Sequence, residues 1–504
     1  MMSKTRQSLA VFSWVVMALP PLAFGQSAVR DDFYWLGQIN KASAVINVDE
    51  GLLDRAHATL IASGLQRVLL AGNVPKAKRP STVIAFEPLL IQAAGVEATW
   101  LHAGRSSQDM LATVRLAVQR DEVLRLASSL QHVRANLVRL AQTHADTVVP
   151  NYTNGVAAQP NSYGHYLLGH LAGFDRDAQR LHEVFARLDR SPMGTTVLNG
   201  SSWPLNRERM AAYLGFSATV ENAYDASQIL SAEMPVEVGA VVSSIALHVG
   251  GFIEDVMVQY AQPRPWILLS EGGENTYVSS AMPQKRNPGL LNSTRADASG
   301  VVMLGLGRLI MQHNLPPGMS DNKSTREMVH MTSETVAMLK SFDKILNGLV
   351  IDPQRALEEL NLDWTASQEI ADVLMRQHKL PFRVGHHFAS EMVSYAKQKN
   401  IPPSEFPFVQ AQRIYQETLQ HEMGVSKGQL PMSEAEFRAT LDPVAIVRNR
   451  QTAGGPQPRE MARMLTAAHQ RLQQEQRWIQ ERRERIDTAT QSLERDFSRL
   501  LAQP

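Results

Sequence analysis

The segment from Val278 to Pro288 reads Val-Ser-Ser-Ala-Met-Pro-Gln-Lys-Arg-Asn-Pro and combines side chains that are suited to chemistry. It places the hydroxyls of Ser279 and Ser280 close in sequence to the cation of Lys285 and the amide of Asn287. A cation and amide donors beside a serine are what stabilisation of a developing oxyanion, or of a carboxylate that gains charge, requires. Composition alone does not exclude an ordinary turn before a helix.

This segment resembles the G-S-S-x-M-P-x-K-x-N-P signature of the aspartase/fumarase superfamily, with Val278 in place of the glycine. Three further segments, in the same order as in argininosuccinate lyases, resemble that branch: 102–109, 152–160 and 194–204. The resemblance implies an all-α fold with three helical domains, of which the central one is a bundle of long helices. It also implies that four subunits pack these bundles into a tetrameric helical core, in which each active site draws on three subunits.

The reaction that the resemblance implies is elimination of an amine from an N-substituted aspartate, with release of fumarate and without a metal or organic cofactor. Matching positions make Ser279 the catalytic base, which its loop and nearby donors must activate because a free serine is far too weak. Lys285 and Asn287 would hold the carboxylate at which negative charge builds. The other residues expected to bind substrate are Arg105, Ser106, Gln108, Thr153, Asn154, Gln159, Ser280 and Met282.

Some of these residues also have structural interpretations. Arg105 is compatible with a structural ion pair, and Thr153 is compatible with a cap of the following helix. His165 and His170, which follow in the sequence, fit packing or surface positions better than a role as base. Ser279, Lys285 and Asn287 together are harder to explain as structure.

The sequence departs from argininosuccinate lyases at positions that matter for the mechanism. Asn154 and Asn292 stand where those enzymes have a His and a Glu that form a charge-relay pair. An asparagine does not titrate near neutral pH, so this relay is not available. Residues that handle the arginine end of the substrate also differ, at Ser107, Gln108 and 39–43. This pattern resembles relatives that cleave aminopolycarboxylates such as ethylenediamine-disuccinate.

Three functions therefore remain open at the level of sequence. The first is a lyase for an argininosuccinate-type substrate, and the second is a lyase for aminopolycarboxylates. The third is a non-catalytic, carboxylate-binding or structural protein on the same fold. The intact Ser279, Lys285 and Asn287 argue against the third function, whereas Asn154 and Asn292 argue for it.

The elements that must position these residues are predicted to be helices. From about Ala42 onward the chain is rich in Leu, Ala, Gln, Arg and Glu, which favour helix. Apolar residues between 116 and 137 recur at helical spacing, and no run alternates with period two for long enough to predict a sheet. The predicted divisions are an N-terminal helical domain, a central bundle that carries the serine loop, a small C-terminal helical domain and a C-terminal amphipathic helix: 26–110, 111–362, 363–464 and 465–504.

The C-terminal helix has one apolar seam at a strict seven-residue spacing. Its members are Leu465, Leu472, Ile479, Ile486, Leu493 and Leu500. The second heptad seam holds mostly polar residues, whereas a sustained coiled coil needs both seams apolar. The pattern predicts a helix that lies on the body of the protein or on a neighbouring subunit.

The composition excludes several classes of protein. The 504 residues contain no cysteine, which excludes disulfides, zinc-thiolate sites, iron–sulfur clusters and a thiol nucleophile. A formal net charge of +1 gives no drive for nonspecific nucleic-acid binding. A hydrophobic content of 44% with 20% charged residues is typical of neither a disordered chain nor a polytopic membrane protein.

The N-terminus resembles a secretory signal. Lys4 and Arg6 precede an apolar run from Leu9 to Leu22, and small residues at Ala23 and Gly25 suit a signal peptidase. The run is short for a bilayer span, so cleavage is favoured over anchoring. We therefore expect residues 1–25 to be a signal peptide, and the mature protein to be periplasmic or secreted, without a membrane segment.

Overall fold

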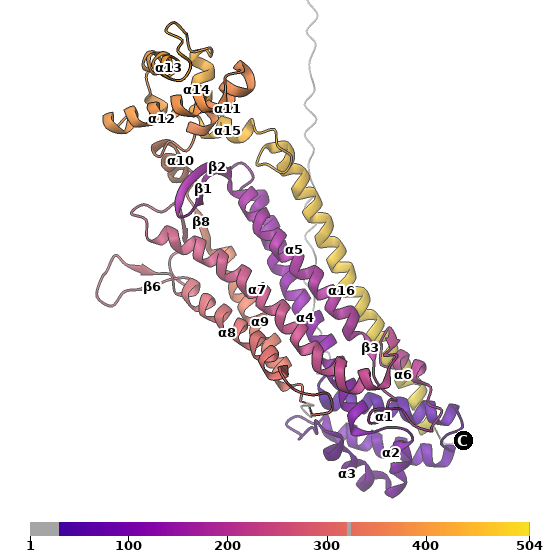
Figure 1. Cartoon of the computed structure of the whole chain (residues 1–504). Helices are drawn as coiled ribbons and strands as arrows, with labels where there is room; N and C mark the ends of the chain where they lie inside the picture. Colours follow the sequence, from indigo (N-terminus) through magenta and orange to yellow (C-terminus); the bar gives the residue numbers. More distant parts are fainter. Residues whose placement is uncertain (1–29, 320–323, 503–504) are drawn as a thin grey trace, which may run out of the picture.

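The computed structural model describes residues 30–319 and 324–502 of the chain. The predicted signal peptide, residues 1–25, lies outside the described residues. The described part is built mainly from helices, which form a long bundle with a smaller group of helices at each end (Figure 1). The predicted all-α fold is confirmed, whereas the exact domain boundaries stay predictions.

Five long helices form the bundle and contribute to one hydrophobic core. They are α4 (Ser107–Thr143), α5 (Tyr163–Leu188), α7 (Leu230–Tyr260), α8 (Gly289–Gln312) and α9 (Arg326–Gly348). The apolar residues of α4 that recur at helical spacing are all buried: Leu116, Leu124, Leu126, Leu130, Val133 and Leu137. Because a helix rises 1.5 Å per residue, the 37 residues of α4 span about 55 Å.

Helix α7 is the most apolar element of the bundle. Together with the π-helical turn η2 (Asp225–Ile229) before it, it is long and apolar enough to cross a membrane by length and composition. Its most apolar window is 50% buried inside the protein, as is typical of a core helix. Gly239 on α7 and Gly305 on α8 bring these two helices close together, because a Cβ at Gly305 would overlap the carbonyl oxygen of Gly239.

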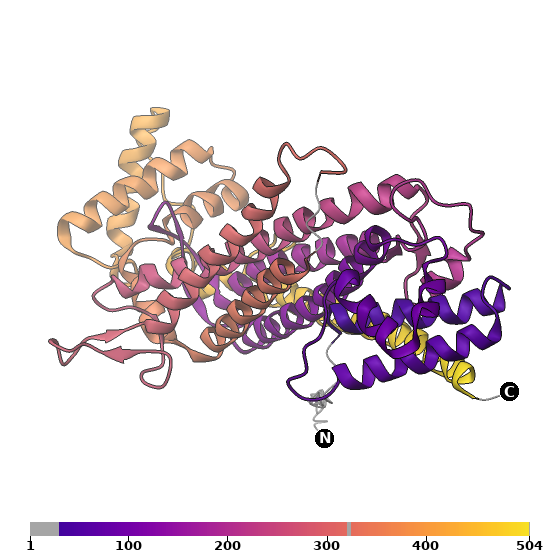
Figure 2. The same ribbon diagram turned by 90° about the horizontal axis from the view of Figure 1, so that it is seen from below.

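Groups of shorter helices cover the two ends of the bundle (Figures 1 and 2). The N-terminal group comprises α1 (Asp32–Asp49), α2 (Arg55–Gly72), α3 (Val83–Ala94), the 3-10 helix η1 (Val96–His102) and, nearby, α6 (Arg207–Tyr213). The C-terminal group comprises α10 (Pro353–Leu362), α11 (Ser367–His378), α12 (Phe382–Lys399), η3 (Pro403–Glu405), α13 (Phe408–Met423), α14 (Glu434–Leu441) and α15 (Pro443–Arg448). Most of this second group has a core of its own, around Phe388, Phe406 and Phe437.

The last helix, α16 (Pro458–Leu501), runs back along the bundle from the C-terminal group to the N-terminal group (Figure 1). Its seven-residue seam faces the main core: Ile479, Ile486, Leu493 and Leu500 are buried, and Leu465 and Leu472 are partly buried. The prediction that this helix lies on the body of the protein is confirmed.

Short strands interrupt the helices, always in two-stranded pairs among the described residues. They are the antiparallel pairs β1 (Val148–Thr153) with β2 (Val156–Ser162), β5 (Ile267–Leu269) with β8 (Leu349–Ile351) and β6 (Tyr277–Val278) with β7 (Arg286–Asn287), and the parallel pair β3 (Arg190–Ser191) with β4 (Ala218–Thr219). The sequence analysis predicted no sheet and therefore did not identify the β1–β2 hairpin. Its signal was the turn at Asn154 and Gly155, whose φ angles of 52° and 76° suit Asn and Gly.

Candidate active site

The serine loop is the tip of the β6–β7 hairpin, which projects from the side of the bundle (Figures 1 and 2). The backbone N–H groups of Ala281 and Met282 point at Oγ of Ser279, at 3.4 and 3.2 Å. Two N–H dipoles aimed at one hydroxyl oxygen favour its anionic form. These two N–H groups are donors of the kind that activation of Ser279 as a base requires.

The loop is held in shape by its own hydrogen bonds. Ser279 N–H donates to the carbonyl of Lys285 at 3.2 Å, and Lys285 N–H donates to the carbonyl of Met282 at 3.0 Å. The amide of Asn287 donates to the carbonyl of Tyr277 across the hairpin at 3.4 Å, so Asn287 has a structural contact here. The side chains of Ser280, Met282 and Lys285 are exposed, and among the described residues no carboxylate lies within ion-pairing distance of Lys285.

Arg286 is a positioning residue that the sequence analysis did not single out. Its Nε donates to Oε2 of Glu271 at 3.0 Å, and its Nη1 donates to the carbonyl of Pro283 at 2.7 Å. These contacts tie the loop to the segment before β6. The neighbouring Lys285 is left exposed to meet an anion.

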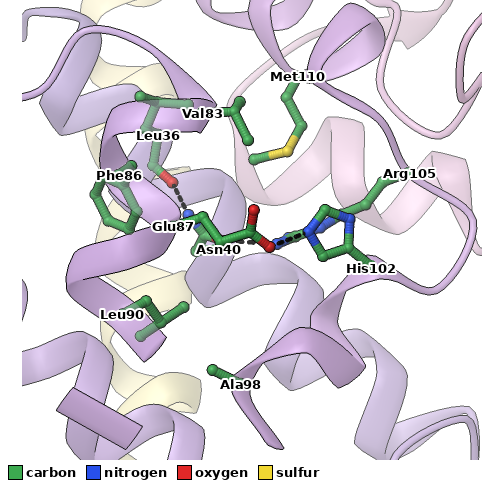
Figure 3. Close-up of a pocket in the computed structure, with 10 residues that line it drawn as sticks. All are labelled: Leu36, Asn40, Val83, Phe86, Glu87, Leu90, Ala98, His102, Arg105 and Met110. Atoms are coloured by element: carbon green, nitrogen blue, oxygen red, sulfur yellow. Dashed lines mark hydrogen bonds and ion pairs between the residues drawn. The ribbon is translucent and has the colours of Figure 1, made fainter. Parts of the chain in front are cut away.

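Arg105 lies just before the N-terminus of α4 and faces α1. Its guanidinium donates to Oγ of Ser43 at 3.0 Å and to Oδ1 of Asn40 at 2.8 Å (Figure 3). No carboxylate among the described residues is within ion-pairing distance of it, so the alternative of a structural ion pair is not what the structure shows. Burial lowers the pKa of Arg105 to about 10, against the effect of nearby Asp109 and Glu87. The side chain is still a cation at neutral pH.

The surroundings of Arg105 favour an anion but do not form a complete substrate pocket. The positive end of the long α4 dipole adds to the charge of the guanidinium. The cavity lined by Asn40, Glu87, His102 and Arg105 has a volume of about 20 Å³, which is room for a water molecule and not for an N-substituted aspartate (Figure 3).

Ser106 and Asp109 form a capping box at the start of α4. Oγ of Ser106 accepts the N–H of Gln108 at 3.1 Å, so this predicted substrate-binding residue also has a structural role. Asp109 is fully buried and joins two segments, because its carboxylate accepts N–H bonds from Ser106 at 2.8 Å, Gly194 at 2.9 Å and Thr196 at 3.1 Å. Asp109 thus holds the 194–204 segment against the start of α4, a role that the sequence did not reveal.

Thr153, Asn154 and Gln159 lie on the β1–β2 hairpin. Thr153 and Asn154 are exposed at its tip, whereas Gln159 donates to Oε1 of Gln368 on α11 at 2.6 Å. Thr153 does not cap the next helix, since Oγ of Ser162 accepts the N–H of His165 at the start of α5. That alternative interpretation is therefore wrong.

The two histidines on α5 have packing contacts, as expected. The ring of His165 is 2.8 Å from the carbonyl oxygen of Gly454, which lies just before α16. His170 packs against Tyr166 and Phe252, with ring centroids 4.6 and 5.0 Å apart. Burial lowers the pKa of His170, which keeps it neutral.

The three groups of candidate residues do not meet within one chain. Arg105, Ser106 and Gln108 lie at the N-terminal end of α4, whereas Thr153 and Asn154 follow its C-terminal end, about 55 Å away by the rise of the helix. Figure 1 shows the β1–β2 hairpin and the β6–β7 hairpin far from α1 to α3. A single chain therefore does not bring these three groups of residues into one site.

Comparison with known proteins gives a consistent family. Residues 72–303 match a family described as lyase, and residues 364–448 match the argininosuccinate lyase C-terminal family. Curated argininosuccinate lyases of Methanosarcina acetivorans and Desulforamulus reducens are 26% and 28% identical, over 90% of this chain and 90% and 95% of their own lengths.

Solved structures share the fold. A crystal structure of EDDS lyase in complex with formate aligns with a TM-score of 0.83 at 24% identity, over 93% of this chain and 92% of that one. The argininosuccinate lyase C-terminal match and the curated relatives point to the same branch as segments 102–109, 152–160 and 194–204. The chain is an argininosuccinate lyase-like member of the aspartase/fumarase superfamily.

Proposed function

We propose that the protein cleaves the C–N bond of an N-substituted aspartate and releases fumarate and an amine. The observation that carries this proposal is the serine loop, in which two backbone N–H groups face Oγ of Ser279 and Lys285 stays exposed beside it. Ser279 removes a proton from the carbon next to a carboxylate, and Lys285 stabilises the negative charge that develops on that carboxylate. Collapse of this charge forms the double bond of fumarate, and the C–N bond breaks as a general acid protonates the nitrogen, which leaves as the amine.

The active site is assembled between subunits of a homotetramer. Support comes from the distance between the candidate groups along α4 and from an unpartnered apolar face on α8. On this face Met303, Leu306, Leu309 and Ile310 are each at least half exposed, which is unusual for adjacent large apolar residues of a monomer. In the proposed tetramer another copy buries this face, and each active site draws its groups of residues from different subunits.

The leaving amine is either the arginine of argininosuccinate or a smaller amine such as that of ethylenediamine-disuccinate. Asn154 and Asn292 favour the second, because both are exposed in the single chain and neither can relay a proton. EDDS lyase is also among the structures that share this fold. Export through residues 1–25 would place the enzyme with substrates taken up from outside the cell rather than with arginine biosynthesis.

The first test is to incubate the purified protein with argininosuccinate and with ethylenediamine-disuccinate, and to follow fumarate by its ultraviolet absorbance. Fumarate from the second substrate alone assigns the chain to the aminopolycarboxylate lyases. Fumarate from argininosuccinate would show that the reaction proceeds without the His–Glu pair, which Asn154 and Asn292 replace in this chain. If a folded protein releases fumarate from neither substrate, nor from a panel of other N-substituted aspartates, the carboxylate-binding alternative replaces the lyase.

The second test is Ser279→Ala. We expect turnover to fall by at least about 10³-fold, since the proton-abstracting oxygen is lost, while binding of fumarate changes little. Gln284→Ala is the matched control, because this side chain is exposed on the same loop and stands at a variable position of the signature. Unchanged turnover in the Ser279 variant would show that another group is the base.

A further inference from the structure

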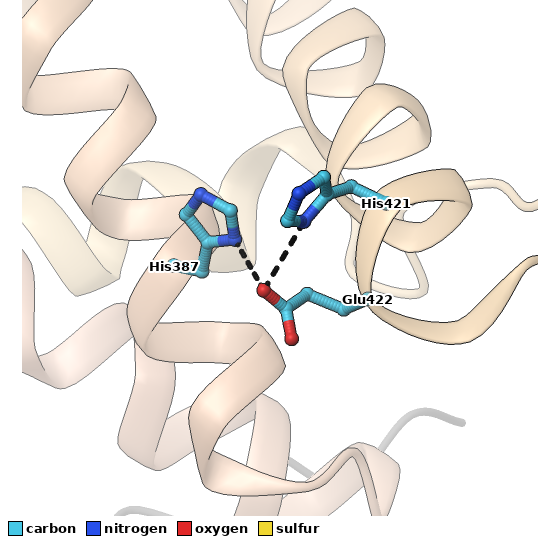
Figure 4. A group of neighbouring side chains, drawn as sticks. All are labelled: His387, His421 and Glu422. Carbon is cyan, nitrogen blue, oxygen red and sulfur yellow. Dashed lines mark hydrogen bonds and ion pairs between the residues drawn. The ribbon is translucent and has the colours of Figure 1, made fainter.

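Two histidines and a glutamate gather between α12 and α13, in the C-terminal group of helices and away from the serine loop (Figure 4). Nδ1 of His387 lies 2.8 Å from Oε1 of Glu422, and Nδ1 of His421 lies 3.3 Å from the same oxygen. The two imidazole rings are 5.2 Å apart at 77°, and one ligand atom from each residue lies within 4.8 Å of the others.

The orientation of His387 is that of a metal ligand. Its Nδ1 faces the centre of the cluster, and its Nε2 lies 3.4 Å from Oε1 of Glu391, one turn further along α12. In the tautomer with its proton on Nε2, the Glu391 carboxylate orients the ring and the Nδ1 lone pair is available to a metal ion. Arg383 contacts the other oxygen of Glu422, Oε2, at 3.3 Å, so that Oε1 faces the two imidazoles.

The surroundings of the cluster favour a cation. Nδ1 of His387 and Nδ1 of His421 both face Oε1 of Glu422, so that three ligand atoms converge on one point. His421 and Glu422 also lie in the last turn of α13, where the negative end of the helix dipole favours a cation.

The two helices hold these ligands in a fixed relation. Phe388, next to His387, packs edge-on against Tyr415 of α13 with ring centroids 5.3 Å apart, and both rings are buried. The ligands therefore stand at the edge of a packed core, and no large rearrangement is needed to bring them together.

We propose that His387, His421 and Glu422 bind a divalent transition-metal ion of the zinc type, which joins α12 to α13. Two imidazole nitrogens and one carboxylate oxygen form a ligand set that suits Zn²⁺, and a fourth position stays open to water because His421 is exposed. Glu391 acts as a positioning residue that orients His387. The site is independent of the proposed elimination.

The test is calorimetric titration of Zn²⁺ into the purified chain after removal of metals with EDTA. We expect saturable binding at one site per chain, weakened by about tenfold or more in His387→Ala and in Glu422→Gln, and by about tenfold in Glu391→Gln. His386→Ala is the matched control, because His386 is the next residue on α12 and its ring contacts Phe382 instead. Metal-free variants should keep the helical circular dichroism and melting temperature of the parent.

A second measurement reports the ligands directly. Co²⁺ bound to the chain should give visible absorption bands of low-coordinate cobalt, and His387→Ala should abolish them. The proposal is overturned if no saturable site is found, if His387→Ala binds Zn²⁺ as tightly as the parent, or if nuclear magnetic resonance shows His387 doubly protonated at neutral pH in the presence of Zn²⁺. The Ser279→Ala protein should bind Zn²⁺ like the parent, which separates this result from that of the lyase test.

Discussion

Arg105 carries a positive charge, and its hydrogen-bond partners are neutral, unlike those of the buried Arg120 and Arg134 on α4. Arg120 and Arg134, for comparison, each pair with a carboxylate at 3.2 Å or less. Asn40 and Ser43 orient the Arg105 guanidinium without neutralising it. At the scale of single residues, this arrangement favours a role in binding a substrate carboxylate over a purely structural one.

We predict that Arg105→Met raises the KM for the substrate by about 10- to 100-fold, because a charged hydrogen bond to a carboxylate is lost. The melting temperature should fall modestly, because the variant leaves the buried oxygens of Asn40 and Ser43 without their donor. Arg105→Lys keeps the charge, so its KM should lie between those of the parent and of Arg105→Met. A large fall in melting temperature with an unchanged KM would mean that Arg105 is structural.

Asp109 shows what a single buried carboxylate does for the site. Its Oδ2 accepts N–H bonds from both Gly194 and Thr196. Asp109→Asn would turn either an NH₂ group or a weaker acceptor oxygen toward these donors. We therefore expect the free energy of unfolding to fall by about 2–4 kcal/mol. Urea denaturation gives the stability, and hydrogen exchange should show faster opening of residues 194–204. Equal protection of this segment in the variant would contradict the role assigned to Asp109.

At the scale of elements, the sequence predicted what periodicity and a long motif can reveal. The helical spacing of apolar residues from Leu116 to Leu137 predicted α4, and the serine-loop signature predicted the superfamily. The β1–β2 hairpin was missed because its strands are short and only the Asn154–Gly155 turn marks it. Contacts such as Asp109 to Gly194 join distant segments, and no local pattern encodes them. The predicted roles of Thr153 and Gln159 stay predictions.

The packing of α7 on α8 depends on the absence of a side chain at Gly305. A Cβ there would overlap Oγ of Ser243 and the carbonyl oxygen of Gly239. Gly305→Ala should therefore destabilise the protein by about 1–3 kcal/mol through overpacking. Gly169→Ala on α5 and Gly251→Ala on α7 meet nothing within 4 Å, and each should stabilise by up to about 1 kcal/mol. Thermal unfolding of the three variants checks this, and a similar effect in all three would refute the packing argument.

At the scale of the whole molecule, α8 presents an apolar face that one chain leaves open. Met303 and Ile310 are 73% and 71% exposed. We predict that Met303→Lys with Ile310→Lys dissociates the proposed tetramer and lowers activity in proportion, as measured by light scattering and fumarate release. Val409→Lys, at an equally exposed position on α13 (77%), is the control and should leave the assembly intact. A double variant that stays tetrameric would place the interface elsewhere.

The separation of Arg105 from Ser279 predicts complementation between two defective proteins. If each site takes its arginine from one subunit and its serine from another, a mixture of Arg105→Met and Ser279→Ala subunits contains sites with both groups intact. With random 1:1 mixing and substrate well below KM, we expect about a quarter of the parental rate. Both variants are dissociated, mixed and reassociated, and fumarate release is compared with that of each variant treated alone. If both groups of a site came from one chain, no mixed site would be complete, and the rate would stay at the average of the two variants.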